Sequence, residues 1–168
     1  GFPALLLPVH LVWLELIIHP TALLVFQEMA VDGKLAYQSH SRQLRFFTKW
    51  QWFVITLVGL MVTLVITVAY VRSLGAGYNV DHARAMALVS LTAASVGITV
   101  VLSRMHSRTA WCIVMITIGL SLLLVQTPAF SGFLHLVPLH IDDWLLAIAG
   151  GLMAAAFTLL DSMYKSND

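Results

Sequence analysis

A glutamate and a histidine lie within the first long apolar run of this chain, residues 9–26, which reads VHLVWLELIIHPTALLVF. Glu15 and His19 are four residues apart, so they share one face if the run is helical. A charged side chain at the bilayer centre costs about 3 kcal/mol, so ionisable residues within spans usually face a protein interior or an ion path. The pair therefore predicts a site for a cation or a proton.

Pro20 directly follows this histidine and predicts a break in the helix. Proline has no N–H, and its ring crowds the backbone carbonyl of Leu16, so the helix should kink or unwind there. In discontinuous membrane helices, freed carbonyls beside polar side chains coordinate ions. We therefore expect Glu15 and His19 to contribute to an ion path; an internal hydrogen-bonded pair is the alternative.

The composition places these residues in a membrane protein. Of the 168 residues, 60% are hydrophobic and 10% are charged, whereas roughly a quarter of an average soluble domain is charged. A spanning helix needs about 20 apolar residues. Five stretches approach that length, at residues 8–26, 50–70, 85–102, 110–125 and 144–160. We expect an all-α fold with one membrane domain, residues 1–168, in which five transmembrane helices form a bundle in the lipid bilayer.

The lysines and arginines predict how the bundle is oriented. With five spans, one side of the membrane carries Lys34, Arg42, Arg45, Lys49, Arg104, Arg108 and Lys165, and the other carries Arg72 and Arg84. Basic residues concentrate on the cytoplasmic side. We therefore expect the N-terminus outside, the C-terminus in the cytoplasm and a cytoplasmic loop at residues 27–49, with a bacterial plasma membrane as the location. No basic run interleaved with aromatics indicates a nucleic-acid partner.

Small and acidic residues near the later spans have structural explanations. Close helix packing explains Ala93 and Gly97 in the third span and Ala147, Gly151 and Ala155 in the fifth. The Asp142–Asp143 pair favours a helix start, where exposed N–H groups attract negative charge. The segment of residues 71–83, VRSLGAGYNVDHA, is expected to be an external loop because it contains turn residues, and His82 falls in it without a motif.

Three local patterns resemble the carboxyl-terminal membrane half of P-type cation-transporting ATPases. LPVHLVWLELIIHPTA, residues 7–22, is similar to the family's sixth-helix pattern, a Pro followed by Leu-Leu-Trp-x-Asn-Leu-x-x-Asp. ARAMAL, residues 83–88, looks like the entry to the eighth helix, and FLHLVPLHIDDWLL, residues 133–146, looks like the start of the tenth. The resemblance implies that the five spans are the sixth to tenth helices of such a pump.

The chain departs from the family at the ion ligands. Glu15 stands where the family has an ion-binding Asn, and His19 stands where it has the Asp. Ser95 falls at the position of an eighth-helix ligand of some calcium-type members. The resemblance implies that these three residues belong to the ion path, and the Glu–His pair would suit a proton or a divalent ion that tolerates nitrogen ligation.

The family's phosphorylated aspartate lies in an Asp-Lys-Thr-Gly-Thr motif, which does not occur in this sequence. This chain alone should not hydrolyse ATP and should hold no cofactor. The resemblance implies that its partners are the preceding membrane helices and the cytoplasmic phosphorylation domain of the pump, where ATP and Mg²⁺ would bind. The alternative is a free-standing, non-transporting helix bundle that acts as a docking or regulatory subunit. A membrane-embedded enzyme has little support, because HExxH and paired intramembrane aspartates are missing.

Overall fold

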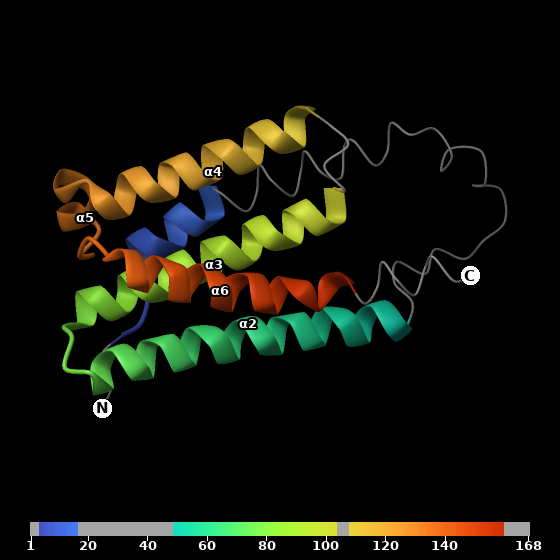
Figure 1. Ribbon diagram of the computed structural model, residues 1–168, viewed down its shortest axis with the longest axis horizontal. Helices are drawn as coiled ribbons and strands as arrows, with labels where there is room; N and C mark the ends of the chain where they lie inside the picture. Colours follow the sequence, from blue (N-terminus) through green and yellow to red (C-terminus); the bar gives the residue numbers. More distant parts are fainter. Residues whose placement is uncertain (1–3, 17–48, 104–107, 160–168) are drawn as a thin grey trace, which may run out of the picture.

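A computed structural model describes residues 4–16, 49–103 and 108–159 of the chain (Figure 1). Within these ranges the chain is all-helical, which confirms the predicted fold class. A short helical stretch covers residues 8–16. The labelled helices that follow are α2 (Lys49–Gly75), α3 (Val80–Ser103), α4 (Arg108–Gln126), α5 (Pro128–Phe133) and α6 (Ile141–Ala156).

Three of these helices are long and apolar enough to cross a membrane, which partly confirms the predicted five spans. They cover Trp52–Gly75, Val80–Val101 and Arg108–Gln126 and correspond to the second, third and fourth predicted spans. The fifth predicted span corresponds to α6, which begins a few residues earlier than expected. The first predicted span is described only as far as residue 16, so the predicted break at Pro20 lies outside the described residues.

The central helix of the bundle is α3, which packs against α2, α4 and α6. In its most apolar window 56% of the residues are buried, against 17% in the corresponding window of α2. The first half of α3 is the most deeply buried part and includes Ala83, Ala85, Met86, Ala87, Leu88 and Val89. The small alanines let neighbouring helices approach this segment closely.

Among the described helices, α3 and α6 share the most extensive contact, and small residues line it. A Cβ atom built on Gly97 would lie 2.6 Å from the Cβ of Ala155. On the other side of the contact, a Cβ on Gly151 would lie 2.7 Å from the backbone carbonyl oxygen of Ser90. The close packing predicted from the small residues is therefore confirmed.

The connection between α2 and α3 is much shorter than the loop predicted at residues 71–83. It consists of residues 76–79, because α2 continues to Gly75 and α3 begins at Val80. Gly77 has a φ of 82°, in the left-handed region that favours glycine. The prediction that His82 lies in a loop was wrong: it lies in the first turn of α3. Figure 1 shows this connection, α5 and the start of α6 at one end of the bundle, which we call the turn end.

Candidate functional site

Glu15 lies on the exposed face of the first helical stretch, together with Leu11, Val12 and Leu16. The opposite face carries the buried side chain of Leu14, which belongs to the hydrophobic core. The helix therefore turns Glu15 away from the core of this chain. Its expected companion on that face, His19, lies outside the described residues.

Ser95, the third predicted ion-path residue, is half-buried in α3. Its backbone carbonyl accepts a hydrogen bond of 2.8 Å from the Thr99 hydroxyl. Across the described ranges, no group of three or more His, Cys, Asp or Glu side chains could hold a metal ion. A complete cation site is thus not assembled from the described acidic and imidazole side chains alone.

Sequence reasoning missed His10, whose imidazole is fully buried at the start of the first helical stretch. The backbone N–H of Leu7 donates to its Nδ1 over 3.1 Å. Because Nδ1 accepts that bond, Nε2 carries the ring hydrogen and donates it to the Leu134 carbonyl, 2.6 Å away. The three-residue spacing resembles a capping box in which the imidazole takes the place of the usual acidic side chain. Because Leu7 is not a usual capping residue, the sequence pattern gave no signal for this role of His10.

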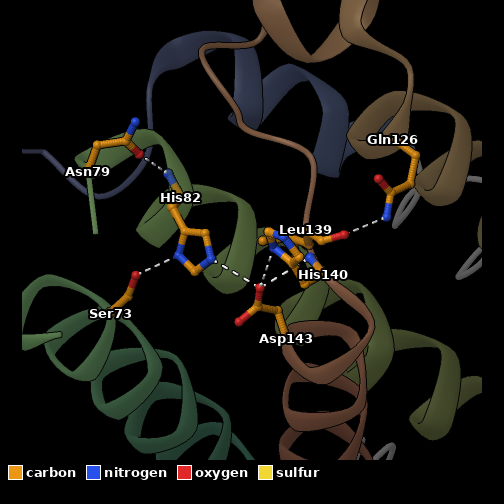
Figure 2. A network of polar contacts seen from close by, with 7 residues as sticks. All are labelled: Ser73, Asn79, His82, Gln126, Leu139, His140 and Asp143. Carbon is orange, nitrogen blue, oxygen red and sulfur yellow. Dashed lines mark hydrogen bonds and ion pairs between the residues drawn. The ribbon is translucent and has the colours of Figure 1, made fainter. Parts of the chain in front are cut away.

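A second buried histidine, His82, organises a polar cluster at the turn end (Figure 2). Its Nδ1 lies 2.8 Å from the Ser73 hydroxyl, and its Nε2 lies 3.2 Å from Oδ2 of Asp143. The backbone N–H of His82 donates to the Asn79 side chain over 2.8 Å, which caps the start of α3. We call Ser73, Asn79, His82 and Asp143 the turn-end cluster.

Asp143 also caps its own helix. The backbone N–H of His140 donates to Oδ2 of Asp143 over 3.1 Å at the start of α6. This bond confirms the helix-start role predicted for the acidic pair. A single carboxylate oxygen therefore joins the first turn of α3 to the first turn of α6.

The sequence matches the family model described as "Cation transporting ATPase, C-terminus" over residues 3–165. The chain belongs to this family. The match confirms the predicted resemblance and covers nearly the whole C-terminal membrane region that the sequence patterns indicated. No curated protein and no solved structure gives a significant match.

As the C-terminal region of a cation-transporting ATPase, the chain is an integral membrane protein. The exposed side of its helices therefore faces lipid or other protein rather than bulk water, and this matters for Glu15. In water an exposed glutamate needs no explanation. Within an apolar membrane helix, a carboxylate facing lipid would cost about 3 kcal/mol, so its surroundings should be protein or an aqueous path.

The turn-end cluster has the Ser–His–Asp composition found in hydrolases, but among the described residues its serine and its histidine are both buried. Ser73 is only 5% exposed. Two apolar cavities, of about 510 and 260 Å³, are lined by residues outside the cluster. A nucleophilic serine must reach its substrate, so this geometry favours a role in joining helices.

Proposed function

We propose that this chain is the C-terminal membrane module of a P-type cation-transporting ATPase and that it supplies part of the ion path. Glu15, His19 and Ser95 are the proposed ion-path residues, with a helix break at Pro20. The single observation that carries the proposal is the placement of Glu15 on a face directed away from the core of this chain.

Anchoring of the first helical stretch supports this role for Glu15. His10 and Leu14, one helical turn apart, are both buried, and His10 is bonded to the Leu134 carbonyl. These contacts fix the rotation of the helix about its own axis. Glu15 then belongs to the face that we propose a partner covers.

The preceding membrane helices of the pump are the proposed cover for this face. Glu15, His19 and Ser95 are too few to replace the water around a cation, so those helices would supply further ligands. The cargo would be a proton or a divalent cation that tolerates nitrogen ligation. ATP and Mg²⁺ would bind the cytoplasmic domains, and residues 27–49 would contact the phosphorylation domain. The proposed orientation has the N-terminus outside and the C-terminus in the cytoplasm of a bacterium.

Cation binding by the full protein tests the proposed site. Glu15→Gln removes the charge and keeps the size of the side chain, so we expect it to reduce the affinity for the transported cation by at least tenfold. Asp142→Asn is the matched control, because it makes the same chemical change at an exposed residue of α6. Equal binding by the Glu15→Gln variant and the unaltered protein would remove Glu15 from the ion path.

A free-standing docking or regulatory bundle is the second candidate. The replacement of the family's Asn and Asp by Glu15 and His19 favours it, because the usual ligand set is lost. Such a bundle would be indifferent to cations. We would measure its unfolding temperature with and without divalent ions, and a rise that depends on Glu15 would count against this candidate.

A further inference from the structure

The His82 imidazole has a hydrogen-bonding partner at each nitrogen, and both partners suit either protonation state. Asp143 only accepts when ionised, so Nε2 carries a hydrogen in both states. In the neutral ring, Nδ1 accepts the hydroxyl hydrogen of Ser73. In the protonated ring, Nδ1–H donates to the Ser73 oxygen, which also accepts. A proton can therefore enter this buried site without the imidazole losing either of its hydrogen bonds.

We infer that His82 is a proton-binding site and that its protonation tightens the turn end of the bundle. The proton converts the contact with Asp143 from a hydrogen bond of a neutral ring into an ion pair. The bond is charge-assisted in both states, because Asp143 is ionised, and the proton adds the attraction between two opposite charges that are largely shielded from water. Because Ser73, His82 and Asp143 belong to α2, α3 and α6, the added strength holds three helices together.

The groups around the imidazole make Asp143 the carboxylate that responds to this proton. The Tyr78 ring stacks on the imidazole, with ring centroids 4.2 Å apart. On α3, Asp81 is already paired with Arg84 over 2.8 Å. From α2, the described groups near the imidazole are Ser73 and the exposed Arg72 in the last turn. At the start of α6 they are the exposed Asp142 and the exposed N-cap residue His140. Nδ1 of His140 lies 3.8 Å from Oδ2 of Asp143.

The decisive variant is Asp143→Asn, which keeps an acceptor oxygen for both His82 and the His140 backbone and removes only the charge. We would follow amide hydrogen exchange in residues 73–82 and 140–146 of the full protein in lipid nanodiscs. Near pH 8, where histidines are mostly neutral, the variant should exchange only slightly faster than the unaltered protein, because both donors keep an acceptor oxygen, now a neutral one. Near pH 5.5 its exchange should be about fivefold faster than that of the unaltered protein, since the ion pair with the protonated imidazole is then lost as well.

Two further variants keep this test specific. In a His82→Gln background, Asp143→Asn should produce no pH-dependent change, because no imidazole remains to be charged. His135→Gln removes an exposed histidine outside the turn-end cluster and should leave exchange unchanged at both pH values. The inference is overturned if Asp143→Asn has equal effects at the two pH values, or if its pH-dependent effect persists without His82. Neither outcome bears on cation transport, so the proposed function is tested separately.

Discussion

The Nε2 atom of His10 lies 2.6 Å from the carbonyl oxygen of Leu134, a residue 124 positions later that forms the C-cap of α5. The bond attaches the first helical stretch to the segment between α4 and α6. It fixes that stretch in rotation as well as in position, because the imidazole is fully buried. The exposed placement of Glu15 follows from this anchor.

His10→Ala should destabilise the protein by about 2 kcal/mol, since it leaves the Leu134 carbonyl without its side-chain donor and opens a cavity. Unfolding in mixed detergent micelles would measure the change. His135→Ala, at an exposed residue of the loop before α6, should have little effect. Equal stability of the two variants would show that the His10 anchor contributes nothing.

Gly151→Ala should separate α3 from α6. The new Cβ would lie 2.7 Å from the Ser90 carbonyl oxygen, which is backbone and cannot rotate away. Overpacking of this kind typically costs about 1–3 kcal/mol. Gly59→Ala is the matched control, because a Cβ there meets nothing within 4 Å and alanine favours the helix. In thermal unfolding, Gly151→Ala should therefore melt at a lower temperature than Gly59→Ala, and similar melting temperatures would contradict the close packing of α3 and α6.

Asn79→Ala should lower stability by about 1 kcal/mol through loss of the cap at the start of α3. The same variant should speed amide exchange in the first turn of α3, where the Asn79 side chain accepts the His82 N–H. Asn79→Asp retains a capping oxygen and should restore slow exchange. Failure of aspartate to rescue would mean that Asn79 acts in some way other than capping.

The long helices and the positions at which they pack closely were predictable from the sequence, because both depend on local composition. Long apolar runs indicate spans wherever they occur, and Gly97 and Gly151 belong to small-residue patterns typical of close helix pairs. The early start of α3 was also within reach, because Asn79 is a favoured N-cap residue directly before Val80 and the acidic Asp81 falls in the first turn. The turn residues Gly75 and Gly77 instead favoured a loop longer than the connection of residues 76–79 that the structure shows.

The turn-end cluster could not be predicted in this way. His82 and Asp143 are 61 positions apart and meet only because α3 and α6 pack together. Hydrophobic periodicity assigns residues to a helix face, but it does not pair one helix with another. The burial of His10 against Leu134 was hidden for the same reason. Glu15 could be singled out from the sequence alone, because a carboxylate in an apolar run is conspicuous without any tertiary information, and its role in the ion path stays a prediction.

The most direct measurement of the proposed ion path is ATP-driven cation uptake by the full protein in proteoliposomes, compared between Glu15→Gln and Asp142→Asn. Because Glu15 is proposed to contact the cation, the first variant should lose nearly all uptake while its helices and expression remain intact. The exposed Asp142 lies at the start of α6, so the second variant should transport normally. Undiminished uptake by Glu15→Gln would contradict the assignment of the ion path to this face of the helix.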